Sequence, residues 1–334
     1  MGIDVRKATD DDLDRWNDYV DRSTGGTPFH RREALSVMAE TSGADFHPLV
    51  GFKGQEPVGL LPAFQVDVGP VTAAFSPPPD LRIPYLGPVV LESSQLKQRK
   101  AERRHRRFVD GAVEWLGDAV APRFVHFRTV TAYDDLRPLQ WNGFEATPAH
   151  TYVVDLTRDR DDLLSSFSSD ARQNIRSGED VEYAVREGDV DDVRRIVDGV
   201  RRRYEEQGLT YGIDPSFVTA LYRRLPDGVV RPYVCTVDGE YAGGMVTLES
   251  DDTIYRWQGA VDTSVDAPAN DLLDWHIMRD AMDRDVAGYD MVGADTRRLN
   301  GYKAKFGPAV VRYHRMERAS LPVRYAARLY QRLR

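Results

Sequence analysis

Two lysines lie two residues apart in the segment RRLNGYKAKFGPAVV, residues 297–311. The chain has six lysines against 39 arginines, so Lys303 and Lys305 supply a third of all its lysine side chains. A lysine ammonium is a compact charge on a flexible stem and its pKa shifts readily, whereas arginine is a permanently charged planar fork. The change of residue type makes this segment a candidate site. The alternative is a pair of solvated surface lysines.

A second group of polar residues has helical spacing. Arg172 and Arg176 are four residues apart, which places them on one face of a helix, with Asn174 between them. Two guanidinium forks on one face are able to clamp a phosphate or a carboxylate bidentately. The alternative is that these arginines form ion pairs with nearby Asp170 or Glu179.

The other candidate site residues lie in or just after predicted strands, or near the end of a predicted helix. Asp295 comes just after the short apolar strand of YDMVGAD, where a carboxylate facing a cleft would serve as a base. Gln258 lies with Tyr255 on the aromatic strand TIYRWQGAV, whose side chains we expect to alternate between the two faces. A substrate contact and an internal hydrogen-bonded group are both open for Gln258. Tyr204 and Tyr211 flank a helix end and would line a substrate pocket or form an aromatic wall.

Composition excludes several classes of protein. The single cysteine, Cys235, rules out an intramolecular disulfide and a cysteine-based zinc cluster, and its apolar surroundings are typical of a buried thiol. No segment approaches the roughly 18 apolar residues of a membrane span. The N-terminal residues lack the apolar core of a secretion signal. We therefore expect a cytoplasmic protein.

The charge pattern is acidic and uneven. The chain has 38 Asp against 15 Glu and a net charge of −8, which indicates a salt-adapted (halophilic) cytoplasm and argues against general nucleic-acid binding. The run KQRKAERRHRRF, residues 97–108, carries seven basic residues in twelve. It is either a solvated helix face or a contact for tRNA or membrane headgroups. The basic, amphipathic tail LPVRYAARLYQRLR, residues 321–334, would also suit an anionic membrane surface.

The second half of the chain alternates between strand and helix periodicity. A strand and two helices come first, with Gly208 ending one helix and Asp214 capping the next. Three strands then form an antiparallel meander, because the connectors DGE and SDD are hairpin signals. A long helix, a short strand, a helical stretch and a last strand complete the order β-α-α-β-β-β-α-β-α-β. The helix after the meander leaves a splayed, mixed sheet.

The first half repeats this element order more loosely, which predicts two copies of one architectural unit. We expect domains at residues 1–157 and 158–334. Each would be an α/β (α+β) unit with a mixed, splayed, mostly antiparallel sheet flanked by helices. The candidate residues fall in the second domain, which would carry the active site.

Four segments of the second half resemble the FemAB-type subfamily of GNAT acyltransferases, in which two GNAT domains follow in tandem. The segments are LLSSFSSDARQNIR, APANDLLDWHIMRDA, GYDMVGAD and YKAKFG. The last is similar to the Phe-Lys-x-x-Phe-Gly segment of that subfamily, with Tyr302 in place of the first Phe. GTPFHRREAL and VGLLPAFQV in the first half also resemble its first domain, so the resemblance covers nearly the whole chain.

The resemblance implies transfer of an acyl or aminoacyl group to an amine without a metal. Donors in the wider fold are coenzyme A thioesters, whereas the Fem subfamily uses aminoacyl-tRNA and a peptidoglycan precursor. Lys303 matches the family lysine, which would stabilise a phosphate or developing negative charge. The splay beside the strand of Gln258 would hold the acyl carbonyl.

One loop departs from the family pattern. Coenzyme A-binding members carry a Gln/Arg-x-x-Gly-x-Gly/Ala loop after the meander, whose amides hold the pyrophosphate. Here the segment is VDTSVDAPAND, residues 261–271, with no glycine and three aspartates that would repel a pyrophosphate. A salt-adapted cytoplasm of archaeal type would also lack peptidoglycan as an acceptor.

We therefore expect an N-acetyltransferase or aminoacyltransferase, with acyl-coenzyme A or aminoacyl-tRNA as donor. Its acceptor would be an amino group of a sugar, peptide or lipid-linked precursor, such as a cell-envelope or glycan precursor, met in the cytoplasm or at the membrane surface. The alternative is a non-catalytic protein that uses the tandem fold to recognise a phosphorylated or peptidyl ligand. The missing pyrophosphate loop favours that alternative.

Overall fold

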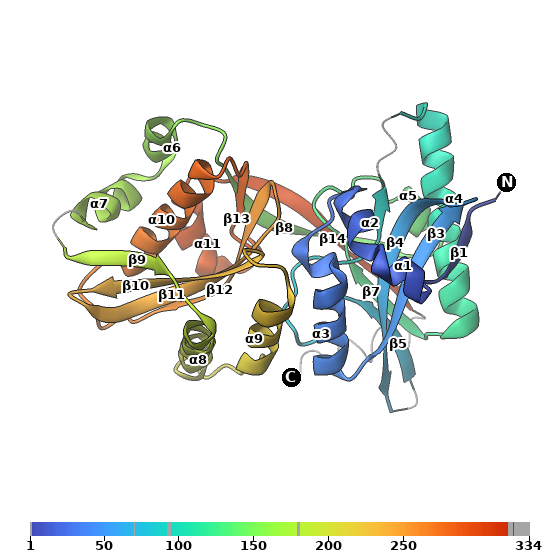
Figure 1. The fold of residues 1–334 in the computed structure, drawn as a ribbon, viewed down its shortest axis with the longest axis horizontal. Coiled ribbons are helices and arrows are strands. Elements are labelled where there is room, and N and C mark those ends of the chain that lie inside the picture. Colours follow the sequence, from blue (N-terminus) through green and yellow to red (C-terminus); the bar gives the residue numbers. More distant parts are fainter. Residues whose placement is uncertain (1, 70, 92–94, 179–180, 320–322, 324–334) are drawn as a thin grey trace. The chain divides into compact units, whose positions relative to one another are not determined.

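The computed structural model describes residues 2–69, 71–91, 95–178, 181–319 and 323 (Figure 1). The chain forms two compact units. Unit 1 comprises Met1–Ala149 and the segment from Arg312 onward, and unit 2 comprises His150–Val311.

Unit 1 is built on a mixed sheet with strand order β1-β3-β4-β5-β7-β14. α3 covers one face of this sheet and α4 covers the other (Figure 1). Its strands are β1 (Asp4–Lys7), β2 (Ser23–Thr24), β3 (Asp45–Lys53), β4 (Glu56–Val68), β5 (Val71–Ser76), β6 (Val89–Leu91), β7 (Phe124–Arg128) and the start of β8 (Glu145–Asp155). Its helices are α1 (Asp10–Asp14), α2 (Trp16–Asp21), the 3-10 turn η1 (Pro28–His30), α3 (Arg32–Ser42), α4 (Gln98–Ala119) and α5 (Arg137–Trp141).

Unit 2 has the strand order β8-β13-β12-β11-β10-β9, antiparallel except for the β12–β13 pair. Helices α8 and α9 lie on one face of this sheet, and α10 and α11 lie on the other (Figure 1). Its strands are β9 (Tyr183–Glu187), β10 (Val230–Val237), β11 (Glu240–Glu249), β12 (Thr253–Val261), β13 (Gly288–Asp290) and the start of β14 (Ala309–Ala319). Its helices are α6 (Arg160–Ser166), α7 (Ser169–Ser177), α8 (Val190–Glu205), α9 (Pro215–Arg224), α10 (Ala269–Asp283) and α11 (Arg297–Ala304).

The element order of unit 2 confirms the order predicted from periodicity, and its helix ends show why the prediction succeeded. The side chain of Asp214 accepts a 2.8 Å hydrogen bond from the main-chain N–H of Ser216, which satisfies a free donor at the start of α9. Gly208 adopts φ +67° just after α8, a conformation that glycine takes without steric cost. The mixed, mostly antiparallel sheet flanked by helices is the fold class that the sequence predicts.

The two units exchange their last strands. β8 begins in unit 1, but its residues Val153–Asp155 pair with β13 in unit 2. β14 begins in unit 2, but Arg315–Ala319 pair with β7 in unit 1. Periodicity along the chain divides it at residue 157, whereas the compact units divide within β8 and again within β14. A strand pattern reveals a strand but not its partner, so the sequence did not show this exchange.

The core of unit 2 lies between α10 and the sheet. α10 is buried on most of its surface, and Leu273, Ile277 and Met278 belong to the apolar core. Phe167 packs edge-on against Trp275 and Phe306, with ring centroids 5.6 and 5.3 Å apart, respectively. These contacts fix the ends of α6 and α11 against α10, and α11 carries Lys303.

Candidate active site

β12 changes its pairing part-way along its length. Thr253–Tyr255 pair in parallel with Gly288–Asp290 of β13, whereas pairing with β11 continues to Val261. From Arg256 on, the side of β12 that faces away from β11 has no strand partner within the described sheet. Buried main-chain N–H and C=O groups need hydrogen-bond partners, so this half of β12 is suited to bind a ligand through its backbone.

A β-bulge at Trp257 decides which side chains of β12 share a face. Val246 of β11 pairs with Gln258, but the next residue, Thr247, pairs with Arg256. Arg256 bonds to α10, and Gln258 bonds to the α8–α9 connection on the opposite face. Strict alternation would place Arg256 and Gln258 on one face. The expected alternation is therefore wrong from Trp257 onward, because the bulge adds one residue.

On the α8–α9 face, the structure brings Gln258, Tyr211 and Tyr204 together. The Tyr211 hydroxyl donates a hydrogen bond to Gln258 Oε1, and the Tyr204 and Tyr211 ring centroids are 5.1 Å apart. Arg298 of α11 donates a hydrogen bond to Gln207 Oε1 just after α8. This contact joins α11 to the tyrosine cluster.

On the α10 face, a cavity of about 320 Å³ lies beside the end of β12. Its wall comprises Val261, parts of the 262–271 segment, and side chains from α7 and α11. Its charged lining residues are Asp262, Asp271 and Lys305. Two carboxylates against one ammonium leave a net negative charge around the cavity.

In the cavity wall, Lys305 and Asn174 both contact Asp271. Lys305 Nζ lies 2.5 and 2.6 Å from the two carboxylate oxygens of Asp271, whose side chain is 3% exposed. Asn174 donates a hydrogen bond to the same carboxylate. The Lys305 ammonium also lies 4.4 Å from the centre of the Tyr302 ring, within the range of a cation–π contact. The structure thus brings Asn174 and Lys305 together through Asp271.

A buried polar network lies next to Tyr302. Asp274 of α10 is fully buried, and it accepts hydrogen bonds from Arg256 Nε at 2.7 Å and from the hydroxyls of Tyr289 and Tyr302. Burial acts to lower the pKa of Arg256, but the Asp274 charge outweighs it, so the pKa is raised and the guanidinium stays charged. Burial and the same charge raise the pKa of both tyrosines, which remain hydrogen-bond donors. Neither Arg256 nor Asp274 was predicted as a site residue from the sequence.

Lys303 is buried, with 7% of its surface exposed. Its Nζ donates 2.8 Å hydrogen bonds to the main-chain carbonyls of Val292 and Gly293. Burial, followed by the nearby charge of Arg256, lowers the pKa of Lys303 to about 8. Two of its three N–H donors hold the loop after β13. The spacing of residues in the sequence does not predict that Lys303 holds this loop.

The loop after β13 is held from both sides. Val292 has φ +50°, an uncommon conformation for a β-branched residue, and Gly293 follows at φ +86°. Asp290 accepts hydrogen bonds from the Val292 N–H at 2.7 Å and from the Thr151 hydroxyl, and Thr151 accepts one from the Gly293 N–H at 2.9 Å. A strained backbone that several partners hold in place is a feature that clusters at functional sites.

Asp295 lies at the end of this loop and pairs with His150, which was not predicted as a site residue. His150 Nδ1 lies 3.1 Å from Asp295 Oδ1, and the His150 main-chain N–H donates to Asp295 Oδ2 at 3.3 Å. Both side chains are 38% exposed. A carboxylate on one ring nitrogen orients the other nitrogen for proton transfer. The two residues are 145 positions apart, so no local pattern reports the pair.

The remaining candidates lie apart from these groups. Tyr255 is 8% exposed and pairs with Asp290 in the β12–β13 register, and burial followed by the Asp290 charge raises its pKa. Arg172 donates hydrogen bonds at 2.9 and 2.8 Å to the main-chain carbonyls of Ser165 and Phe167, at the end of α6. Arg176 is exposed on the last turn of α7. A clamp formed by the two arginines remains a prediction.

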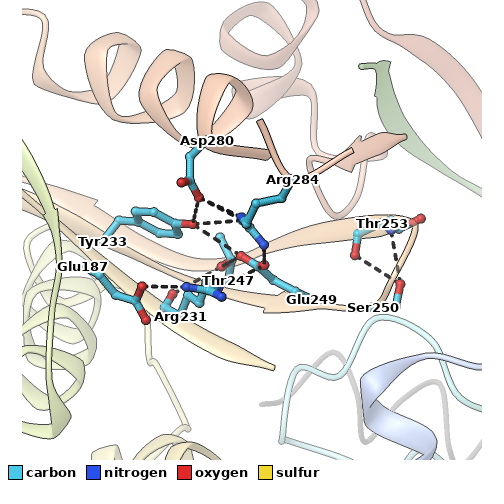
Figure 2. Close-up of polar contacts among 9 residues, drawn as sticks. All are labelled: Glu187, Arg231, Tyr233, Thr247, Glu249, Ser250, Thr253, Asp280 and Arg284. Carbon is cyan, nitrogen blue, oxygen red and sulfur yellow. Dashed lines mark hydrogen bonds and ion pairs between the residues drawn. The ribbon is translucent and has the colours of Figure 1, made fainter. Parts of the chain in front are cut away.

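A separate ionic cluster ties α10 to the meander (Figure 2). Glu249, whose side chain is 5% exposed, lies 2.5 Å from Arg284 and 3.2 Å from Arg231. Asp280 accepts a 2.7 Å hydrogen bond from the Tyr233 hydroxyl and also pairs with Arg284 (Figure 2). These residues come from the ends of β10, β11 and α10 away from the 262–271 segment. Their contacts are with one another, which indicates a structural role.

The described residues also bear on whether the chain has a reactive thiol, a metal-binding cluster or a membrane-spanning helix. Cys235 is buried, and burial raises the pKa of its thiol to about 11, as expected for an unreactive structural cysteine. Within the described ranges, no cluster of three or more His, Cys, Asp or Glu side chains is arranged to hold a metal ion. Nor does any helix there have both the length and the apolar character to cross a membrane.

The basic run 97–108 forms the start of α4, and part of its charge is paired. Arg104 is buried against Glu56, and Arg106 lies 3.8 Å from Asp110. Lys97, Arg99 and Lys100 are exposed. Binding of tRNA or membrane headgroups through this run remains a prediction. Apart from Val323, the tail 321–334 lies outside the described residues.

Comparison with known proteins agrees with this geometry. Residues 165–304 match the family model described as an acetyltransferase (GNAT) domain. A search of curated proteins finds no match. Among solved structures, FemX is similar over 93% of this chain and 96% of its own, with 15% identity and a TM-score of 0.72.

Two further structures share the fold. The C-terminal domain of a protein from Agrobacterium fabrum, described as a lysylphosphatidylglycerol synthetase, has 14% identity, a TM-score of 0.60 and 95% coverage of both chains. L-PGS from Bacillus licheniformis has 12% identity and a TM-score of 0.56, again with 95% coverage of each. The chain therefore has the FemAB-like tandem GNAT fold that the sequence predicts, and residues 165–304, in its second unit, match a GNAT acetyltransferase domain.

Proposed function

We propose that this chain is an acyltransferase that moves an acyl or aminoacyl group from an activated donor to an amine. The observation that carries this proposal is that β12 and β13 pair only as far as Tyr255 and Asp290, next to a cavity and two polar clusters in unit 2. The match of residues 165–304 to the GNAT domain supports the same reaction class.

Acyl transfer to an amine needs a base and donors to the oxyanion. The amine lone pair attacks the acyl carbon and forms the C–N bond, and the carbonyl oxygen gains negative charge. When the carbonyl re-forms, the bond to the sulfur or oxygen leaving group breaks and that atom departs with the electron pair. The amine proton passes to the base.

Named residues fit these roles. His150 of β8, oriented by Asp295 in the loop after β13, is the base. Main-chain N–H groups of β12 donate to the oxyanion, and the Lys303 ammonium adds positive charge while it holds the loop. Gln258 with Tyr204 and Tyr211 forms a wall for the acceptor on the α8–α9 side.

The cavity favours an aminoacyl donor over coenzyme A. Asp262 and Asp271 line it, and Lys305 is already paired with Asp271, so a pyrophosphate would meet net negative charge. The ammonium group of an aminoacyl donor would meet the same charge favourably. FemX and the domain of a lysylphosphatidylglycerol synthetase share the fold of this chain. Lysylphosphatidylglycerol, the product in the second name, carries an aminoacyl group.

The acceptor class follows from the reaction. We propose an amino group on a sugar, peptide or lipid-linked precursor, such as one for the cell envelope or a glycan. A lipid-linked acceptor would bring the protein to the membrane surface from the cytoplasm. The exposed basic side chains at the start of α4 support such a contact.

Calorimetric titration at high salt with acetyl-coenzyme A and with aminoacyl-tRNA tests the donor. We expect binding of aminoacyl-tRNA and a weaker or absent signal from acetyl-coenzyme A. Tighter binding of the thioester would contradict the donor assignment but keep the reaction class. Binding of donors without transfer to any amine would instead support the non-catalytic alternative.

A further inference from the structure

Residues of α8 and α9 line a groove of about 470 Å³. These two helices lie on the sheet face opposite α10 (Figure 1). Arg194 of α8 lines one side, and Arg223 and Arg224 of α9 line the other. Ser216 and Asp214 lie at the α9 N-terminal end of the same groove. The groove differs in position and charge from the acidic cavity beside β12.

The groove is lined mainly by basic side chains, whereas the whole chain is acidic. The whole protein has 53 acidic residues against 45 basic ones, yet three arginines line this groove against one aspartate. The Asp214 carboxylate is engaged as the cap of α9, where hydrogen bonds from Ser216 lower its pKa. Arg194 pairs with Asp191 at 2.9 Å, but the two side chains are 49% and 79% exposed, so this pair is weak.

We propose that the α8–α9 groove is a binding site for a phosphate monoester. Guanidinium groups are planar forks that bind phosphate oxygens bidentately, and here three of them line one groove from two helices. Three arginines and one aspartate leave two net positive charges, which match the dianion of a monoester above its second pKa of about 6.

The site is independent of the proposed acyl transfer. A ligand in this groove contacts α8 and α9 and none of the residues that line the cavity beside β12. A phosphorylated acceptor or a separate phosphorylated effector would both present the same monoester group. Binding of the monoester alone therefore tests the site without any assay of transfer.

The test is calorimetric titration of the whole chain with glycerol 3-phosphate at low salt, with dimethyl phosphate and a single-stranded RNA oligonucleotide as diester probes. We expect saturable binding of glycerol 3-phosphate and an increase in Kd of about tenfold in Arg223→Gln and in Arg194→Gln, the loss of one charge-assisted hydrogen bond. Arg202→Gln, on α8 but outside the groove, is the matched control and should bind normally.

Three results would overturn the proposal. The first is no saturable binding of glycerol 3-phosphate by the folded wild-type protein. The second is an equal loss of affinity in Arg202→Gln, which would indicate a diffuse charge effect. The third is tight binding of a diester probe without binding of the monoester.

Discussion

The ammonium of Lys303 donates a 2.8 Å hydrogen bond to the carbonyl of Val292, a β-branched residue with φ +50°. The lysine on α11 thus holds a strained turn that follows β13, next to the point where β12 and β13 separate. Its second bond, to Gly293, secures the next residue of the same turn. Lys303 therefore holds this loop together with Asp290 and Thr151, and the same side chain takes part in the proposed chemistry.

Lys303→Ala should lower the free energy of unfolding by roughly 2–4 kcal/mol, because two partly buried carbonyl groups lose their charged donor. The variant should stay folded, since typical domains have about 5–15 kcal/mol of stability, but its turnover should fall strongly. Urea denaturation measures the loss. Lys100→Ala on the exposed face of α4 is the control, with an expected change within about 0.5 kcal/mol. Equal stability of both variants would contradict the loop-holding role.

The pH dependence of stability should report the burial of Lys303. Its pKa falls from 10.5 to about 8 in the folded protein, so between these values the unfolded chain binds more protons. The free energy of unfolding contributed by this group therefore rises as pH increases through that window. Relative to Lys303→Met, the wild type should gain at most about 3 kcal/mol from pH 8 to 10.5. If the difference in free energy of unfolding between the wild type and Lys303→Met stayed constant across this range, the pKa of Lys303 would not be lowered by folding.

Asp274→Ala should destabilise the protein by about 3–5 kcal/mol, because it leaves the charge of Arg256 buried without its partner. Tyr302→Phe removes one hydrogen bond from the same carboxylate and should cost only about 1 kcal/mol. Asp283→Asn is the control, since its ion pair with Arg160 is exposed. Chemical denaturation of the three variants gives the order. Similar values for Asp274→Ala and Asp283→Asn would refute the buried network.

His150→Gln should reduce turnover by about 10²–10⁴-fold, the usual contribution of a general base. Stability should change by at most about 1 kcal/mol, because the His150–Asp295 pair is partly exposed. Asp295→Asn keeps the imidazole but removes its orienting charge, so it should lose less activity. Steady-state kinetics across pH measures both variants. Full activity of His150→Gln in folded protein would remove the dyad from the mechanism.

Glu249→Ala should destabilise unit 2 by about 1.5–3 kcal/mol, because Arg284 and Arg231 lose a shared buried carboxylate but keep Asp280 and Glu187 as partners (Figure 2). Donor affinity at a temperature where the variant is folded should not change, because the cluster lies outside the cavity lining. Denaturation and donor titration on the same sample separate the two effects. A large change in donor affinity with little loss of stability would give this cluster a functional role.

The sequence predicted the fold well because the relevant signals are local. Helix caps such as Asp214 and the hairpin connectors mark element ends within a few residues, and side-chain periodicity separates helices from strands. The YKAKFG segment also led to the correct fold family. The exchange of β8 and β14 between units depends on strand pairing across more than a hundred residues, which no local pattern encodes.

The candidate site was only partly predictable for the same reason. Lys305 and Asn174 were identified by type and spacing, but their shared partner Asp271 was seen only as one acid in a loop. The bulge at Trp257 reversed the face of Gln258, and a single extra residue in a strand leaves no compositional mark. His150 was missed because its partner Asp295 is distant in sequence.

The most direct test of the central claim is a mass-spectrometric measurement of acyl transfer, with the donor that binds and a panel of amines. The wild type should add the mass of the acyl group to an amine. Ala267→Trp, which places a large side chain in the cavity wall, should lose this activity while Val310→Trp, at an exposed position, keeps it. Full activity of folded Ala267→Trp would contradict the site, and no product from the wild type with any donor and amine would contradict the function.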